Sequence, residues 1–232
     1  MNRNRLIAYL ALLLLIAAII FMPLRMIVGV EGVTARKVEG VIWDGSIRDL
    51  RIGRLAIGDV NARLHFLPLF LGRAKISFSR GDAPFAPGID GSVTRRPGGI
   101  SIDNVKASFP VSALFAPLPA ETLVLKDFSA RFTAGRCTDA SGNVRLTLAN
   151  SLPGLDLSNG LLARPRCDRG QLLIPLLSQS AMEHVDIRIS SDGNYTATIF
   201  LEGDRTEYAA PLALSGFRPV SGGYRMVRKG RF

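Results

Sequence analysis

Apolar and polar residues alternate through most of the chain after residue 35, and this alternation constrains the fold more than any other feature. It is clearest in residues 60–66, 144–149, 185–190 and 195–201. A period of two puts successive side chains on opposite faces of a strand, so that one face of each strand is apolar. No segment between residues 35 and 214 has the spacing of a long amphipathic helix. The pattern therefore predicts a mainly β fold.

Turn-forming residues separate these segments and favour short connections. The chain contains 23 Gly and 13 Pro, and the Asp-Gly-Asn sequence at 192–194 is a strong hairpin signal. The Gly-Asp pair at 58–59 predicts a further turn. Short connections indicate antiparallel strands, and a sheet with one apolar face must curl, fold over itself or receive a lid. We therefore expect a curved, mostly antiparallel sheet over residues 29–217, followed by a basic, partly mobile C-terminal tail over residues 218–232.

An apolar run without any charged residue, residues 6–24, precedes the alternating body. As a helix it would be about 28 Å long, close to the thickness of the hydrocarbon core of a bilayer. A cleaved signal peptide has a shorter apolar core followed by small residues, whereas this run ends in bulky residues and Arg25. We favour an uncleaved signal anchor, so that residues 1–28 comprise the N-terminus and one transmembrane helix.

The orientation of such an anchor follows only weakly from its flanking charges. Arg3 and Arg5 precede the run, and Arg25, Arg36 and Lys37 follow it, which gives a slight bias. The short N-terminus and the two cysteines favour a cytoplasmic N-terminus and a C-terminal domain in the periplasm. The expected location is a bacterial inner membrane, crossed once.

The balance of charge favours anionic neighbours. The formal net charge is +10, which suits phospholipid headgroups, acidic proteins or nucleic acid. The basic residues are scattered, however, and aromatic residues do not alternate with them. This arrangement disfavours a nucleic-acid interface.

Cys137 and Cys167 are the only cysteines, and 29 residues separate them. Two thiols with two distant histidines make a poor zinc site. In the periplasm the pair can form one disulfide, which would stabilise the fold by about 3–4 kcal/mol in the chain-entropy model. The alternative is a pair of unbonded, buried thiols.

No set of residues predicts catalysis, a bound metal or a cofactor. His65 and His184 lack the spacing of metal ligands, and we interpret them as solvated or capping residues. Asp44 and Asp49 could form an acid pair, but both fall at strand ends or turns, where Asp often bonds local backbone amides. Nucleotide-binding, hydrolase and metalloprotease motifs are missing from the sequence. We therefore expect a protein that binds other molecules and is not an enzyme.

Residues 38–46 read VEGVIWDGS and contain the only tryptophan, Trp43. The β-branched residues before it favour a strand, and the Asp-Gly pair after it favours a turn or bulge. The simplest interpretation makes Trp43 a core anchor beside a turn. In the alternative, its ring is exposed and grips a partner.

These motifs, in their order, resemble the GspN family, protein N of the bacterial type II secretion system. In that family a G-x-x-W-x-G element precedes a strand, which ends near a Leu/Pro-rich segment that closes in Gly-Arg. The matching residues here are Gly40, Trp43, Gly45, Pro68, Leu69, Leu71, Gly72 and Arg73. The later matches are Cys167, Gly170, Gly193 and Tyr195, with a glycine- and arginine-rich close. Related chains often carry a tryptophan where this chain has Phe66.

The resemblance implies an inner-membrane accessory of the secretion machine. Its single helix would anchor a periplasmic β domain, and its partners would be other secretion components or passing exoproteins. The family has no catalytic residues to transfer to this chain. The expected function is therefore protein–protein interaction in exoprotein secretion.

The glycine turns and short amphipathic strands are also similar to AsmA-like proteins, which build long curved sheets with an apolar inner groove. This second resemblance implies a lipid-binding or lipid-transfer protein. The apolar stripe could shelter acyl chains, and the basic surface could attract phosphate headgroups. Phospholipid is therefore an alternative partner.

Overall fold

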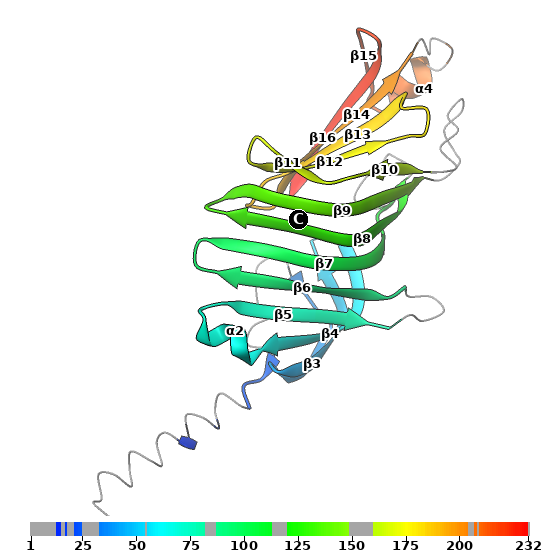
Figure 1. The fold of residues 1–232 in the computed structure, drawn as a ribbon. Helices are drawn as coiled ribbons and strands as arrows, with labels where there is room; N and C mark the ends of the chain where they lie inside the picture. The colour runs from blue at the N-terminus through cyan, green and yellow to red at the C-terminus, as the bar shows by residue number, and fades with distance from the viewer. Residues whose placement is uncertain are drawn as a thin grey trace, which may run out of the picture.

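A computed structural model gives the fold (Figure 1). It describes residues 13, 14, 17, 21–24, 33–53, 55–81, 87–112, 120–148, 160–203, 207 and 209–231. They include one sheet of 16 strands and two short helices, α2 (Phe66–Phe70) and α4 (Ala209–Leu214). The prediction of a mainly β fold is confirmed.

The strands follow one another with few interruptions. The first eight are β1 (Val33–Thr34), β2 (Lys37–Val41), β3 (Asp44–Ile52), β4 (Leu55–His65), β5 (Ala74–Arg80), β6 (Ile89–Arg96), β7 (Gly99–Pro110) and β8 (Ala120–Thr133). The second eight are β9 (Arg136–Leu148), β10 (Leu161–Ala163), β11 (Arg166–Asp168), β12 (Gln171–Leu177), β13 (Glu183–Ile189), β14 (Asn194–Glu202), β15 (Arg218–Val220) and β16 (Gly223–Arg231).

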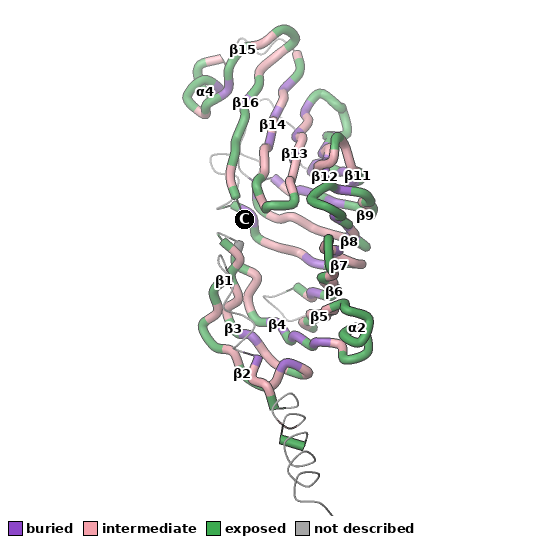
Figure 2. The backbone as a smooth tube through the Cα atoms, turned by 90° about the vertical axis from the view of Figure 1, so that its left-hand side faces the viewer, coloured by how far each residue is buried: buried purple, intermediate pink, exposed green. Residues whose placement is uncertain are grey.

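Neighbours in the sheet are mostly neighbours in sequence, and every described pairing is antiparallel. The order is β1-β3-β4-β5-β6-β7-β8-β9-β10-β12-β13-β14-β16-β15, with β2 also on β3 and β11 also on β12. The sheet curves, so that β3 and β16 lie toward the same side of the molecule while β6–β9 lie on the other (Figure 2). This confirms the predicted antiparallel sheet, and its curvature is the one expected.

The core lies on one face of this sheet, which we call the inner face. Apolar residues meet across successive strands: Ile102 of β7 pairs with Ala130 of β8, and Leu125 of β8 pairs with Val144 of β9. In the C-terminal part, Ile187 pairs with Ala197 in the same way. The buried members form one continuous hydrophobic cluster that runs from Leu24 to Met226. The alternation in the sequence therefore corresponds to burial on the inner face.

Bulges interrupt the alternation and reset which residues face inward. Asp49, Asn104 and Asp127 have φ values of 53°, 52° and 52°, and the strand register shifts beside each of them. Opposite Asp127, a Cβ at Gly142 would lie 2.6 Å from the Asp127 carbonyl oxygen, so the bulge needs a glycine there. Because a bulge bends its strand and adds twist, these positions contribute to the curvature of the sheet.

The turn predicted at residues 58–59 is wrong, because β4 runs unbroken through them. Gly58 instead takes a φ of +84° inside the strand, and Arg80 Nη1 donates to the flanking carbonyl oxygens of Ile57, at 2.7 Å, and Asp59, at 3.3 Å. The side chain of Arg80 therefore satisfies the backbone where the strand is irregular. The hairpin predicted at residues 192–194 is present between β13 and β14.

The sheet has a seam between β9 and β12. β10 pairs with β9 along its three residues but meets β12 only at Leu162 and Leu177, and the following β11 pairs with β12. The chain therefore crosses from one side of the seam to the other between residues 163 and 166. The disulfide joins Cys137 of β9 to Cys167 of β11, as predicted, and ties the two sides together.

The sheet continues past the boundary predicted between residues 217 and 218, where a C-terminal tail was expected to begin. Residues 218–231 supply β15 and β16, and β16 pairs with β14 along nine residues. Inward-facing Tyr224 and Met226 pair with Leu201 and Ile199. The basic composition that suggested a tail belongs largely to the other positions of a paired strand.

Most of the predicted anchor, residues 6–24, lies outside the described residues. Within the part of the chain that the structure does describe, no helix combines the length and apolar character needed to cross a membrane. The last residues of the run join the sheet: Pro23 forms a bridge with Val41, and Ile42 N–H donates to the carbonyl of Met22 at 3.0 Å. Leu24 is buried in the hydrophobic cluster.

Candidate functional site

The most unusual surface of the described structure is a group of exposed apolar side chains at α2 (Phe66–Phe70), between β4 and β5. No residue of this helix is buried. Four large apolar side chains of the helix and that of Leu71, which follows it, are between 37 and 79% exposed. The four in the helix are Phe66, Leu67, Leu69 and Phe70. We call these five residues the apolar tip. Single exposed apolar residues are common on soluble proteins, whereas a contiguous patch marks a surface that contacts something else.

Trp43 extends the apolar tip onto the neighbouring hairpin. Its ring meets that of Phe66 edge to face, with centroids 5.5 Å apart, and Phe66 meets Phe70 in the same manner at 4.8 Å. Trp43 is half-buried, and the fully buried residue beside it is Ile42. The structure therefore places the tryptophan against an exposed aromatic pair, and the interpretation of Trp43 as a core anchor is wrong.

Gly40 and Gly45 shape the hairpin that carries Trp43. They pair across β2 and β3, and the two-residue turn between these strands is Ile42 and Trp43. Gly40 has a φ of +87°, and a Cβ on it would lie 2.6 Å from the carbonyl oxygen of Asp44. A Cβ on Gly45 would lie 2.6 Å from Cδ2 of Leu24. The glycines therefore let the hairpin close and let the end of the apolar run pack on it.

Pro68 and Gly72 shape the helix that carries the apolar tip. Pro68 lies in the first turn of α2, where a backbone N–H has no intrahelical partner, and its carbonyl accepts from Leu71 N–H at 3.0 Å and Arg73 N–H at 2.9 Å. Gly72 then takes a φ of +67°, with open space around the position of a Cβ, and ends the helix. The two predicted motifs thus meet through the Trp43–Phe66 contact.

A cleft of about 620 Å³ lies beside the apolar tip. Its lining includes three tip residues and four basic side chains: Leu67, Phe70, Leu71, Arg73, Lys75, Arg96 and Arg131. Its one carboxylate, on Asp103, accepts from the hydroxyls of Ser101, at 2.9 Å, and Thr94, at 3.4 Å. We call this the basic cleft.

The floor of the basic cleft is a row of residues across four strands. Lys75 of β5 pairs with Thr94 of β6, which pairs with Ser101 of β7, which pairs with Arg131 of β8. The neighbouring row, beginning with Ile76, belongs to the inner face. The basic cleft therefore lies on the outer face of the sheet. Among the described residues, none of its four basic side chains forms an ion pair.

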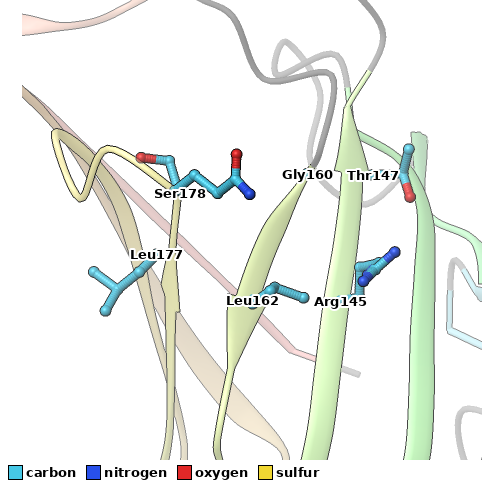
Figure 3. Close-up of a pocket in the computed structure, with 7 residues that line it drawn as sticks. Arg145, Thr147, Gly160, Leu162, Leu177 and Ser178 are labelled. Atoms are coloured by element: carbon cyan, nitrogen blue, oxygen red, sulfur yellow. The ribbon is translucent and has the colours of Figure 1, made fainter.

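A second hollow, of about 470 Å³, lies on the seam (Figure 3). Leu162 of β10 and Leu177 of β12 line it, and both are about half exposed. Arg145 and Thr147 of β9 form its other side, with Gly160, Ser178 and Gln179 at its end. The hollow results from the single pairing between β10 and β12, which leaves their outward side chains uncovered.

The edge of β16 offers a third surface. Residues 223–225 lie between β14 and β15, whereas residues 226–231 pair with β14 alone within the described part of the chain. Val227 and Lys229 are exposed on this stretch. An uncovered strand edge presents backbone donors and acceptors to which another strand can add.

The polar residues considered in the sequence do not come together. His65 bonds to Ser77 at 2.6 Å, and the ring of His184 stacks on Phe200. Asp44 pairs with Arg63, and Asp49 pairs with Arg51. The described residues include no group of three or more His, Cys, Asp or Glu side chains able to hold a metal ion. The contacts of these four residues bring no acid, base and nucleophile together.

Sequence reasoning missed the apolar tip, although a signal for it exists. Residues 66–71 are apolar without interruption and follow a strand of strict alternation. Such a run breaks the alternation of apolar and polar residues and so indicates that the strand has ended. The Gly-Arg pair after it indicates the end of a short helix.

One comparison with known proteins gives a match. The family model described as type II secretion system (T2SS), protein N, matches residues 31–228. No curated protein and no solved structure matches the chain. The matched range takes in all the strands except the last three residues of β16.

Proposed function

The chain belongs to the family of protein N of the type II secretion system, and from this premise we propose that it is an inner-membrane-anchored periplasmic accessory of that system, acting through protein–protein contacts. The family match over residues 31–228 carries the proposal, because it covers nearly the whole sheet. Other secretion-system components, and passing exoproteins, are its proposed partners.

The location is supported by two features of the chain. The uncharged run at residues 6–24 has the length of a membrane span, and its last residues pack on the sheet through Leu24. The Cys137–Cys167 disulfide suits an oxidising compartment such as the periplasm. A single helix at residues 6–24 would therefore hold the sheet close to the periplasmic side of the inner membrane.

The mode of contact is supported by the edge of β16. Residues 226–231 have one described neighbour, β14, so a partner strand could add along six residues. In β-strand addition, backbone hydrogen bonds supply affinity and the alternating side chains supply specificity. The basic side chains of this stretch, such as Lys229, would favour an acidic partner segment.

Site-specific photocrosslinking in cells tests this proposal. A photoreactive amino acid at Val227, on the β16 edge, is expected to crosslink to a secretion-system subunit. The same amino acid at Thr138, exposed on β9, is the matched control and is expected not to crosslink. If neither position captures a secretion subunit, and a deletion strain still exports its exoproteins, the proposed function is wrong.

A second candidate, lipid binding in an AsmA-like groove, is favoured by the curved sheet with its continuous apolar inner face. Acyl chains could lie along that face if the curved sheet opens. Native mass spectrometry of the detergent-exchanged protein tests it: one phospholipid bound per chain supports the candidate. Release of all phospholipid without loss of the fold contradicts it.

A further inference from the structure

The apolar tip does not pack into the hydrophobic core. Among the described residues, its one aromatic contact outside α2 is that between Phe66 and Trp43, and the helix buries none of its residues. Leaving five large apolar side chains in water is unfavourable compared with burying them. A surface of this kind is expected to be covered by something outside the chain.

The position of the apolar tip relates it to the end of the apolar run. Leu64, two residues before α2, donates its N–H to the carbonyl of Ile42 at 2.9 Å, and Ile42 donates its own N–H to the carbonyl of Met22 at 3.0 Å. Three backbone segments are therefore side by side: the end of the run, the Trp43 turn and the strand entering α2. In Figure 1, α2 lies at the same end of the sheet as β3 and β4.

The charges beside the apolar tip fit a phosphate. Arg73, Lys75, Arg96 and Arg131 line the basic cleft without an ion pair among the described residues, and the one carboxylate there is held by two hydroxyls. The cleft's volume of about 620 Å³ has room for a phosphorylated headgroup. Apolar side chains next to unpaired cations match the chemistry of an anionic phospholipid, whose acyl chains adjoin a phosphate.

We propose that the apolar tip and the basic cleft form a second membrane contact, in which the tip enters the bilayer interface and the cleft binds the phosphate of an anionic phospholipid. The inference rests on the proposed membrane anchoring, since the anchor brings the tip to the bilayer. Two attachments, one at residues 6–24 and one at α2, fix the tilt of the sheet on the membrane.

Depth-dependent fluorescence quenching tests the inference on the full-length protein. Leu67→Cys carries an environment-sensitive fluorophore on the apolar tip, and Leu214→Cys on α4 (Ala209–Leu214) is the matched control, since Leu214 is 91% exposed. The native cysteines are bonded to each other and do not compete for the label. The proteins are reconstituted into vesicles of phosphatidylcholine and phosphatidylglycerol that contain spin-labelled phospholipid.

The label at position 67 is expected to be quenched several-fold more strongly than the label at position 214. Arg131→Ser is expected to lower the ratio of inserted to free tip by about fivefold, since each basic residue near an anionic surface contributes about a fivefold preference. Arg218→Ser, at an exposed position on β15, is the matched charge control and is expected to leave the quenching at position 67 unchanged. Vesicles of phosphatidylcholine alone are expected to give weaker quenching at position 67.

Alkaline extraction of the membranes separates failure of this inference from failure of the proposed anchoring. Protein that is extracted contradicts the anchoring itself. Protein that stays in the membrane while position 67 is no more quenched than position 214 overturns the second contact and leaves the anchoring intact. If the label at position 67 is shielded from water only when other secretion proteins are present, and lipid does not quench it, the second membrane contact is wrong and the tip binds a protein partner.

Discussion

The two described helices have similar sequences and opposite surroundings. α2 (FLPLF) and α4 (AAPLAL) are short, apolar and have proline as their third residue. Each interrupts the path between two neighbouring regions of the sheet. Yet α4 buries Leu212 in the hydrophobic cluster, while α2 buries nothing.

The difference arises from the path of the chain after each helix. After α4 the chain turns at Gly216, and Phe217 N–H donates to the Leu212 carbonyl at 3.0 Å, which packs Phe217 into the core beside Leu212. After α2 the chain passes through Gly72 directly into β5, and residues 71–73 are all exposed. An apolar helix in this fold is therefore part of the core only where the chain turns back over it. Substitutions in the two regions test this contrast.

The largest effect is expected from loosening the sheet at the seam. Replacing both cysteines with serine, Cys137→Ser with Cys167→Ser, is expected to lower the free energy of unfolding by about 3–4 kcal/mol, because the open loop gains entropy in the unfolded chain. Amide exchange in α4 should speed up, since its protection comes from packing on the sheet. Exchange in α2 should change little.

Chemical denaturation and hydrogen exchange of the full-length protein in detergent measure this effect. Reduction of the wild-type disulfide serves as the control and should reproduce the result without a substitution. Equal acceleration of exchange in both helices would show that α2 is also held by the sheet, and the two helices would then not differ in how they are covered.

The next effect comes from shortening one leucine in each helix. Leu212→Ala is expected to cost about 2–4 kcal/mol, since it leaves a cavity among buried residues. Leu67→Ala, at an exposed position, is expected to change stability by less than about 0.5 kcal/mol. Thermal unfolding followed by the circular dichroism of the sheet compares the two. A cost above about 1 kcal/mol for Leu67→Ala would mean that the apolar tip packs within the protein.

The sequence predicted the sheet because burial on one face leaves a period of two that can be read directly. It also predicted the disulfide, since a chain with two cysteines allows one pairing. It did not predict the bulges at Asp49, Asn104 and Asp127. In the sequence a bulge appears only as a one-residue shift in the alternation of apolar and polar residues. It misassigned residues 218–231, because basic residues on the outer positions of β16 resemble a mobile tail.

The apolar tip shows why candidate sites are harder to predict than folds. The sequence of residues 66–71 resembles that of residues 209–214, and composition cannot tell which is covered. Covering depends on the path of the chain after the helix, which is a property of the whole fold. Trp43 was misjudged for the same reason: its burial depends on Phe66, on a separate strand connection.

A smaller effect is expected from two glycines that serve the apolar tip differently. Gly45→Ala is expected to cost about 1–3 kcal/mol, since its Cβ would lie 2.6 Å from Leu24 Cδ2 and 2.8 Å from the Glu39 carbonyl oxygen. Gly72→Ala meets no atom within 4 Å, so only its φ of +67° adds strain, about 1 kcal/mol. Denaturant unfolding measures both. Gly45→Ala should also release the packing of Leu24.

Limited proteolysis supplies the second readout for these variants. Gly45→Ala is expected to speed cleavage after Arg25, because the neighbouring residues lose their attachment to the hairpin. Gly72→Ala is expected to speed cleavage only after Arg73. If Gly45→Ala leaves stability and cleavage unchanged, Leu24 does not hold the run against the sheet.

The smallest effect concerns two carboxylates, those of Asp168 in β11 and Glu39 in β2. The Arg188 side chain bonds to Asp168 and holds the pKa of that carboxyl below its ordinary value, and Lys37 does the same for the pKa of Glu39. A carboxyl whose pKa is lowered in the folded state stabilises the fold at pH values above its ordinary, unfolded-state pKa. This contribution is lost as the pH falls through the folded-state pKa.

Arg188→Met should therefore make the protein less stable near neutral pH and less sensitive to acid, because the pKa of Asp168 returns toward its ordinary value. Lys37→Met should act in the same direction on Glu39 but more weakly. The Asp168 and Arg188 side chains are 34 and 33% exposed, against 43 and 61% for Glu39 and Lys37, so water and salt screen the second pair more. Denaturant midpoints measured from neutral pH into the acid range, at low and high salt, compare the variants. An equal loss of acid dependence in both would show that the Asp168–Arg188 pair is no better shielded from solvent than the Glu39–Lys37 pair.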